Sequence, residues 1–381
     1  MFIAFLFLLL NLSVLCIAAE VSGDYEYKVD DGNAIIINYK GTGGDVEIPG
    51  ALDGYSVINI DDFAFFNRKT LTSITIPSSV TRIGRRTFYG CDALASITIP
   101  NSVTTIGEAA FSNCTSLTEI TIPESVTSIG RMAFYKCTGL TTVNILNSVV
   151  GAEMFLGCTA LTVLNMNENV TDIGAYAFGG CTSLQSITIP DSVENIDYGA
   201  FGGCSSLTNV IFNNPNTEFK ETSGVGHPHA PLGPTFYEND NLSTMYAFSG
   251  SQAQRYALDK QLSFVPIARV QLNGQKLKFD VPPIIENGRV LVPMRAIFET
   301  FGAEIDWDGE TSTVTAATSD KSIMMQMGNP QMQLNGKRMT LDVPPQIILD
   351  RTLVPVRAVS EALNATVDWN EETQTVIINI Q

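Results

Sequence analysis

The chain has 381 residues, with 22 basic and 39 acidic side chains and a net charge of −17. This length allows two or three domains and a sizeable core. The acidic balance argues against a nucleic-acid partner, because phosphate binding relies on clusters of Lys and Arg, and no such cluster stands out. The charge suits a soluble, surface-exposed protein, although acidity alone names no ligand.

Residues 1–19 are expected to form a secretory signal peptide. The stretches 2–10 and 12–19 are apolar, and no charge precedes Glu20. Ala18 and Ala19 are suitable cleavage positions, although the positively charged start typical of a signal is missing. An uncleaved anchor is the alternative. Either way we expect an exported protein, extracellular or held at the cell surface, with no membrane segment beyond this one.

Residues 20–70 are expected to form an N-terminal cap. Two strands, near 25–27 and 34–37, flank Asp31-Gly32, a favoured hairpin turn. Ile60 stands 23 residues before Ile83, so the end of the cap already follows the spacing of the repeats that come after it. The cap therefore contains a degenerate first repeat, as expected for an end that must shield a core from water.

Residues 71–212 contain a repeat of about 23 residues, and such a period indicates a solenoid. Each copy contains Leu-x-x-Ile-x-Ile, which alternates as a strand does, and proline follows the strand in most copies. Stacked copies place equivalent residues in columns, and one column would be a phenylalanine spine: Phe88, Phe111, Phe134, Phe155, Phe178 and Phe201. The fourth copy is two residues short, which predicts a local kink.

Six of the seven cysteines keep the register of the repeats, and they have two interpretations. They are Cys91, Cys114, Cys137, Cys158, Cys181 and Cys204. Six cysteines in an exported protein are compatible with disulfides. Equivalent positions in adjacent rungs, however, lie about 4.8 Å apart with parallel side chains, whereas disulfides need converging Cβ atoms about 3.8 Å apart. We favour buried free thiols over rung-to-rung bridges, and a column does not have the geometry of a zinc cluster.

The pairing of Cys-x-x-Leu-x-x-Ile-x-Ile-Pro with Ser-Val-x-x-Ile-Gly-x-x-Ala-Phe resembles the BspA-like leucine-rich repeat family, over about 46–212. The resemblance implies an extracellular scaffold. Members are typically bacterial surface proteins, also abundant in some protozoan parasites, and are associated with adhesion to host proteins or other cells.

Residues that point out of the main strands should form a concave binding face. The candidate residues are Ser73, Thr75, Ser96, Thr98, Glu119, Thr121, Thr142, Asn144, Asn165, Ser186 and Thr188. This face is rich in hydroxyls and amides, with almost none of the aromatic or arginine anchors that protein hot spots use. One interpretation is plain solubilising strand residues. The other is a shallow face that binds a protein or glycan through many weak contacts.

Residues 213–268 should hold a loop insertion and a C-terminal cap. The first part is rich in Asn, Gly and Pro, and contains the only two histidines, His227 and His229. A metal site there is conceivable but has no further ligands nearby. A short helix over 250–257, capped by Ser251, and a final strand over 262–266 complete the predicted cap.

Residues 269–381 contain a second duplication, with a spacing of 62 residues. Gly-Arg-Val-Leu-Val-Pro-Met-Arg at 288–295 matches Asp-Arg-Thr-Leu-Val-Pro-Val-Arg at 350–357. Each unit is predicted to contain a hairpin, a strand, a helix and a second hairpin. Asn273-Gly274 and Asn335-Gly336 are favoured hairpin turns, Pro293 and Pro355 suit a first helical turn, and Gly302 and Asn364 suit a left-handed helix end.

This module resembles the copper amine oxidase N-terminal-like domain of exported Gram-positive proteins, through Gly-Arg-x-Leu-Val-Pro-x-Arg followed by Glu and Asp-Trp. The resemblance implies a non-catalytic appendage, since the oxidases hold their copper by three histidines elsewhere. We interpret Arg295 with Glu299, and Arg357 with Glu361, as structural pairs at helical spacing; a carbohydrate- or peptide-binding role for the arginines is the alternative. Trp307 and Trp369 are predicted core anchors.

The sequence thus predicts an α+β chain, a β-rich leucine-rich-repeat solenoid followed by a duplicated α+β module. We expect an exported, non-catalytic surface protein, without cofactor or metal site. Its solenoid would bind an extracellular protein or glycan in adhesion, and its C-terminal module would associate with the cell envelope. The alternative is binding of a cell-wall carbohydrate polymer by the C-terminal module, with the solenoid as a spacer. No Ser-His-Asp, Cys-His or metal cluster supports an enzyme.

Overall fold

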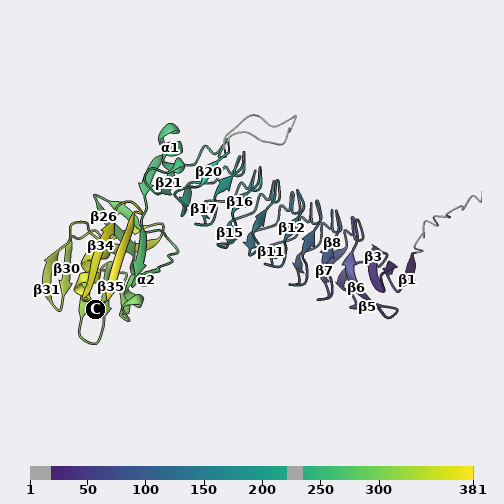
Figure 1. Cartoon of the computed structure of the whole chain (residues 1–381), viewed down its shortest axis with the longest axis horizontal. Helices are drawn as coiled ribbons and strands as arrows, with labels where there is room; N and C mark the ends of the chain where they lie inside the picture. The colour runs from purple at the N-terminus through teal and green to yellow at the C-terminus, as the bar shows by residue number, and fades with distance from the viewer. Residues whose placement is uncertain (1–18, 221–234, 381) are drawn as a thin grey trace, which may run out of the picture.

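The computed structural model describes residues 19–220 and 235–380. Stacked strands form a long solenoid that leads into a C-terminal module of strands and short helices (Figure 1). The predicted α+β class and the order of solenoid and module are confirmed. The predicted signal peptide and the two histidines lie outside the described residues. In the part of the chain that is described, no helix is long and apolar enough to cross a membrane.

The N-terminal cap is a small sheet that continues into the solenoid. Its strands are β1 (Glu20–Ser22), β2 (Tyr25–Asp30), β3 (Asn33–Tyr39), β5 (Ala51–Leu52) and β6 (Tyr55–Ile60). Asp31 and Gly32 have φ values of 47° and 73°, as a type I′ hairpin turn requires, so the predicted hairpin is confirmed. β3 pairs in parallel with β6, which carries the sheet from the hairpin into the repeats.

One side of the solenoid is a row of parallel long strands, which we call the long-strand face. They are β4 (Gly44–Glu47), β7 (Leu71–Thr75), β9 (Ser96–Thr98), β11 (Glu119–Ile122), β13 (Thr142–Ile145), β15 (Val163–Met166), β17 (Ser186–Ile189), β19 (Asn209–Phe212), β21 (Thr244–Ala247) and β22 (Ser263–Pro266). Equivalent residues pair in register, as Ser73 does with Ser96 and Thr142 with Val163. The pattern of the sequence therefore sets the stacking directly.

A second row of two-residue strands lies across the core from the first. Its members are β8 (Arg82–Ile83), β10 (Thr105–Ile106), β12 (Ser128–Ile129), β14 (Val149–Val150), β16 (Asp172–Ile173), β18 (Asn195–Ile196) and β20 (Glu218–Phe219). The row is interrupted between β12 and β14, where the shortened fourth copy begins to deviate. The long-strand row continues through this copy, because β13 pairs with both β11 and β15.

The phenylalanine spine is present and longer than the sequence predicted. Adjacent rings from Phe65 to Phe201 stack with centroids 5.0–5.5 Å apart. The ring of Phe236 then stacks on that of Phe201, with centroids 5.6 Å apart. All the spine residues from Phe65 to Phe201 are fully buried. Phe236 follows the loop insertion, so the insertion interrupts the sequence of a repeat but not its packing.

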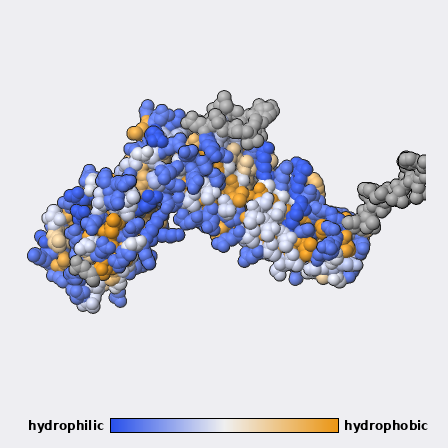
Figure 2. Space-filling model, in the orientation of Figure 1, coloured by the Kyte–Doolittle hydropathy of each residue, from blue (hydrophilic) through white to orange (hydrophobic). Residues whose placement is uncertain are grey.

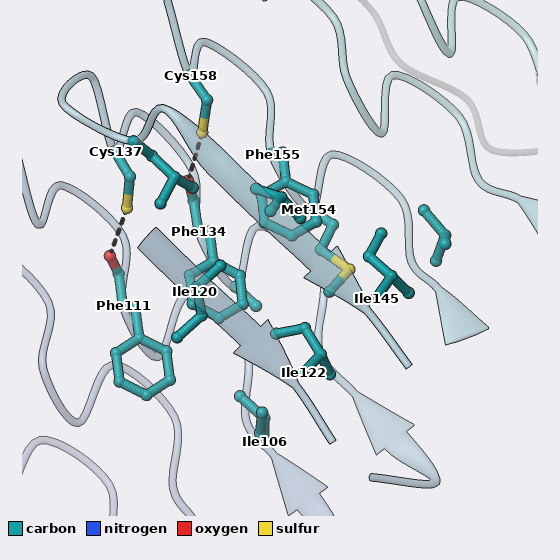
Figure 3. Close-up of a cluster of buried hydrophobic side chains, with 14 of the residues drawn as sticks. Ile106, Phe111, Ile120, Ile122, Phe134, Cys137, Ile145, Met154, Phe155 and Cys158 are labelled. Carbon is teal, nitrogen blue, oxygen red and sulfur yellow. Dashed lines mark hydrogen bonds between the residues drawn. The ribbon is translucent and has the colours of Figure 1, made fainter. Parts of the chain in front are cut away.

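The six cysteines are buried free thiols, as we favoured. Each thiol also donates a hydrogen bond, at 3.1–3.5 Å, to the backbone carbonyl of the spine phenylalanine in the preceding repeat. Figure 3 shows two of these bonds, from Cys137 to Phe111 and from Cys158 to Phe134. In the last rung Asn239 occupies the equivalent place, and its amide donates to the carbonyl of Phe201 at 2.8 Å.

The glycine of the Ile-Gly pair allows neighbouring rungs to approach closely. Its φ is not positive, so it does not supply an unusual backbone conformation. A Cβ on Gly107 would instead lie 2.4 Å from the backbone nitrogen of Arg85 in the preceding rung. Glycine is needed here because the backbones of neighbouring rungs approach closely.

The helix and the strand predicted after the insertion are present. Helix α1 (Gln252–Asp259) begins after Ser251, whose side chain accepts a hydrogen bond from the backbone N–H of Gln254. β22 then pairs in parallel with β21 and ends the long-strand row.

The C-terminal module contains three sheets and two short helices. Its elements are β23 (Arg269–Leu272), β24 (Gln275–Lys276), β25 (Ile284–Glu286), β26 (Arg289–Pro293), α2 (Met294–Thr300), β27 (Glu304–Asp308), β28 (Thr313–Ala317), β29 (Ser322–Gln326), β30 (Gln331–Leu334), β31 (Lys337–Thr340), β32 (Gln346–Ile348), β33 (Arg351–Pro355), α3 (Val356–Ala362), β34 (Ala365–Asn370) and β35 (Thr375–Ile380). The two units are interlocked, because β23 of the first pairs with β35 of the second. A central sheet joins β26 to β33.

Most of the local predictions for this module are confirmed, and one is wrong. The two Asn-Gly turns have positive φ at both residues, and Gly302 and Asn364 end their helices at φ 68° and 65°. Trp369 packs against the core of the module. Trp307, however, is 42% exposed and is not a core anchor, although it occupies the same place near the end of an edge strand as Trp369 does.

The second unit contains a strained turn where the first has Asn287-Gly288. Leu349 and Asp350 both have positive φ, at 49° and 58°. Left-handed backbone is costly for residues with a Cβ, although Asp tolerates it better than Leu. Leu349 packs against the apolar cluster at the junction with the solenoid, which offsets its strain. We therefore expect Asp350→Gly to raise the free energy of unfolding by about 0.5–1 kcal/mol, measured by urea denaturation. An unchanged or lower stability would show that this turn is not strained.

Candidate binding face

The candidate residues proposed from the sequence lie together on the long-strand face. Along each strand the inward residues, such as Ile120 and Ile122, are buried, whereas Glu119 and Thr121 are exposed. Because the strands pair in register, the outward residues of successive repeats form continuous rows. Val163 belongs to one of these rows and is 43% exposed, which adds an apolar point to an otherwise polar surface.

Part of this polar surface is already engaged in hydrogen bonds within the face. Ser73 and Thr72 donate to Asp45 at 2.7 and 2.8 Å, and these bonds lower the pKa of the Asp45 carboxyl. Further along, the amide of Asn165 donates to the side-chain oxygen of Asn144 at 2.8 Å. These side-chain hydrogen bonds join neighbouring strands, so a ligand would meet an ordered surface.

Two hollows lie on the long-strand face. The first, of about 630 Å³, is lined by candidate residues of β7, β9 and β11, including Thr75, Thr98 and Thr121. The second, of about 450 Å³, is lined by the distal part of the face, including Asn165 and Thr188. The candidate face is therefore hollowed at both ends.

The second hollow has a wall that the sequence did not predict. Lys276, Lys278 and Phe279 of the C-terminal module line it, opposite the residues of β15 and β17. In Figure 1 the module extends toward the side of the solenoid on which β11 and β15 lie. No pattern within either region indicates this arrangement, since it depends on how the two regions pack against each other.

The module is fixed to the solenoid by a shared core. Phe248 and Ile267 from the end of the solenoid pack with Ile284, Leu291 and Leu353 of the module. The backbones of both parts are also joined, because Ala268 donates to the carbonyl of Pro283 at 2.9 Å. The module thus packs directly against the end of the solenoid (Figure 2).

Asp191 connects the long-strand row to the module at the edge of the second hollow. Its carboxylate lies 2.8 Å from Arg269 and 2.5 Å from Lys276. Burial alone would raise the pKa of Asp191, but the hydrogen bonds from Lys276 and Arg269 outweigh it and lower the pKa. The guanidinium of Arg269 also lies 4.6 Å from the ring centre of Phe248. These contacts set the orientation of the wall.

Of the two Arg–Glu pairs predicted at helical spacing, the structure shows one. Arg295 lies 4.0 Å from Glu299, one helical turn away, and both are largely exposed on α2. Arg357 and Glu361 are both exposed on α3 and form no ion pair with each other. Residues 269–381 contain no histidine or cysteine, so they do not fit a histidine-bound copper centre. Within residues 19–220 and 235–380, no group of three His, Cys, Asp or Glu side chains is placed to hold a metal ion.

Comparisons with known proteins agree with this architecture. Residues 51–150 and 147–223 match the model of the BspA type leucine rich repeat region, in six copies, and residues 271–378 match that of the copper amine oxidase N-terminal domain. A leucine rich cell surface protein from Faecalibacterium prausnitzii is 30% identical, with 60% of this chain and 70% of that chain covered and a TM-score of 0.49.

Two further relatives are similar over smaller shares of the chain. The leucine rich repeat protein of T. pallidum is 30% identical, with 51% of this chain and 82% of that chain covered and a TM-score of 0.40. A protein named "Protease inhibitor" from Brevibacillus choshinensis is 28% identical over 110 residues, or 28% of this chain. That match spans 33% of the relative's own length.

Proposed function

Because the chain belongs to the BspA-type leucine-rich repeat proteins and carries a copper amine oxidase N-terminal domain, we propose that it is a non-catalytic surface protein that binds an extracellular protein or glycan through its long-strand face. Export to the cell surface and a role in adhesion are part of this proposal.

The observation that carries the proposal is the ordered, exposed face with its two hollows. A solenoid built only for support needs no particular side chains on its outward rows. Here Thr98 and Thr121 are exposed and line the hollow of about 630 Å³. Hydroxyl and amide groups in a fixed array suit a ligand that is held by many individually weak hydrogen bonds.

The C-terminal module has two roles in this proposal. It forms one wall of the second hollow through Lys276 and Phe279. It is also proposed to associate with the cell envelope, and the shared core at the junction would then hold the long-strand face at a set orientation to the cell. The second candidate function, carbohydrate binding by the module alone, assigns the ligand to its exposed arginines instead.

The test is a binding screen of residues 19–381 against extracellular-matrix proteins and a glycan array. For any ligand found, the double variant Thr98→Arg/Thr121→Arg is expected to bind at least 10-fold more weakly, because the added side chains fill the first hollow and shield its hydroxyls. The matched control is Ser128→Arg, which adds the same group to an exposed residue of the short-strand row and should bind as the natural chain does.

The outcome that contradicts the proposal is specific. If both face substitutions leave binding intact while Arg295→Ala or Arg357→Ala abolishes it, the ligand belongs to the module. A measured turnover of amines or glycans by the purified chain would contradict the non-catalytic assignment.

A further inference from the structure

A cluster of positive charge lies at the N-terminal end of this acidic chain. Residues 63–91 contain five basic side chains and no acidic one: Arg68, Lys69, Arg82, Arg85 and Arg86. The overall charge of −17 conceals this concentration. It lies in the same repeats as the first hollow of the long-strand face, on residues that do not line that hollow.

The same repeats expose aromatic rings on the turns that join the short strands back to the long ones. Phe63 is 42% exposed and Phe66 is 37% exposed. The ring of Phe66 stacks on that of Tyr89 in the next repeat, with centroids 5.3 Å apart and planes inclined by 15°. The ring of Phe63 meets that of Phe66 at 5.7 Å with planes inclined by 64°, so the three rings form one cluster.

Two arginines are interleaved with these rings. The guanidinium of Arg85 lies 5.9 Å from the ring centre of Phe63, and that of Arg86 lies 5.9 Å from the ring centre of Tyr89. Arg85 has a loose ionic contact, since its Nε is 3.9 Å from Glu108. Arg86 has no carboxylate of the described residues within ion-pair distance, and its buried Nε makes no hydrogen bond.

Neighbouring charges are largely neutralised, which isolates this pair. Arg82 is bound by Asp61 and Asp62 at 3.4 and 3.1 Å, and Lys69 lies 3.1 Å from Asp92. Arg68 donates to the amide oxygen of Asn38 and has no carboxylate partner among the described residues, so uncompensated charge lies on Arg86 and Arg68, with a partial contribution from Arg85. Of these, Arg85 and Arg86 lie beside the exposed rings.

The geometry points to a second binding surface, formed by Phe63, Phe66, Tyr89, Arg85 and Arg86, for an acidic protein segment that also carries apolar side chains. We call it the aromatic–arginine patch. Aromatic residues and arginine are the side chains that dominate protein–protein hot spots. Carboxylates would pair with the guanidinium groups, and apolar side chains would cover the rings. This surface is separate from the long-strand face and does not depend on its proposed ligand.

A protein segment fits the patch better than an anionic polysaccharide does. A sulfated or uronic glycan needs an extended track of cations, whereas most basic residues here are already paired with carboxylates. A sugar ring would also need an exposed aromatic face to stack against. Here the rings of Phe66 and Tyr89 each cover one face of the other, and guanidinium groups lie near the rings of Phe63 and Tyr89.

The test uses the full chain and two fluorescent peptides, measured by anisotropy at 50 and 300 mM NaCl. One is a 12-residue peptide that repeats Asp-Leu-Glu-Phe, and its twin repeats Asn-Leu-Gln-Phe. We expect the acidic peptide to bind at least 10-fold more tightly than its twin. Its affinity should also be lower at 300 mM than at 50 mM NaCl. Arg85→Gln/Arg86→Gln should weaken it at least 10-fold, and Phe66→Ala about fivefold.

A matched control lies on the same edge of the solenoid. Lys136 approaches the ring of Tyr135 at 5.1 Å but has no neighbouring aromatic cluster, so Lys136→Gln should leave binding unchanged. Circular dichroism checks that each variant is folded. Equal affinity for the two peptides, or acidic-peptide binding that persists in the double glutamine variant, would overturn the inference. So would binding of a heparin octasaccharide that needs the arginines but not Phe66.

Discussion

Replacing Phe134 by alanine is expected to lower the free energy of unfolding by about 4 kcal/mol. Phe134 is fully buried in the middle of the spine, with its ring centre 5.0 Å from that of Phe111 and 5.2 Å from that of Phe155. Alanine would leave a cavity between two rings that the backbone ladders hold in place. Because each repeat is stabilised only by its neighbours, the cavity weakens the coupling between the repeats on its two sides. Urea denaturation followed by circular dichroism measures the change.

The matched control is Phe66→Ala, in the exposed row of the turns. Phe66 is 37% exposed, so we expect a loss of less than about 1 kcal/mol. A similar loss for the two variants would contradict the assignment of one phenylalanine to the core and the other to a surface. A single sharp transition in the control, with a broader one in Phe134→Ala, would support a stack that unfolds from its weakest interface.

The second large effect is a loss of stability at alkaline pH, caused by the cysteine column. Burial raises the pKa of Cys91, Cys137 and Cys204 to about 12, and raises the pKa of the other three thiols well above the ordinary value. The folded state therefore keeps all six thiols protonated, whereas an unfolded chain ionises them above about pH 8.5–9. The stabilisation is complete below that pH and is lost as the pH rises toward the folded pKa.

The size of this effect follows from proton linkage. Each thiol lowers the free energy of unfolding by roughly 1.4 kcal/mol for every pH unit above the pKa that it has in the unfolded chain. Six thiols together remove on the order of 8 kcal/mol by pH 10, which is comparable with the total stability of a typical domain. The measurement is the free energy of unfolding in urea at pH 7 and pH 10, with a reductant present.

The control for the alkaline effect is Cys137→Ala. This variant loses the hydrogen bond to the carbonyl of Phe111 and is expected to be less stable at pH 7. Its deficit should shrink as the pH rises, because the variant releases one proton fewer on unfolding. A deficit that stays constant from pH 7 to 10 would show that the thiol is not shielded from solvent.

Features that depend on neighbouring repeats could be predicted from the sequence, because a fixed period places equivalent residues in contact. The phenylalanine spine and the free thiols follow from this geometry alone. The bond from each thiol to a backbone carbonyl was not predicted. The sequence offers one signal for it, because Asn239 stands where the other rungs have cysteine. An amide and a thiol share little except the ability to donate a hydrogen bond.

Features that depend on packing between distant segments could not be predicted. The wall that Lys276 and Phe279 add to the second hollow arises only when the module docks on the solenoid. Trp307 and Trp369 occupy equivalent places near the ends of the edge strands β27 and β34, yet only Trp369 packs against the core, and the pattern of a strand does not distinguish them. The overall charge of −17 gives no sign of the aromatic–arginine patch, because the basic residues between 63 and 91 are outnumbered by acidic residues elsewhere in the chain.

The central claim is that the long-strand face binds a ligand, and affinity measurement on the face variants tests it most directly. The ligand found in the screen should bind the natural chain and Ser128→Arg equally well. It should bind Thr98→Arg/Thr121→Arg at least 10-fold more weakly, in surface plasmon resonance with the full chain immobilised. Equal affinity for all three proteins would contradict the claim and assign binding to another part of the molecule.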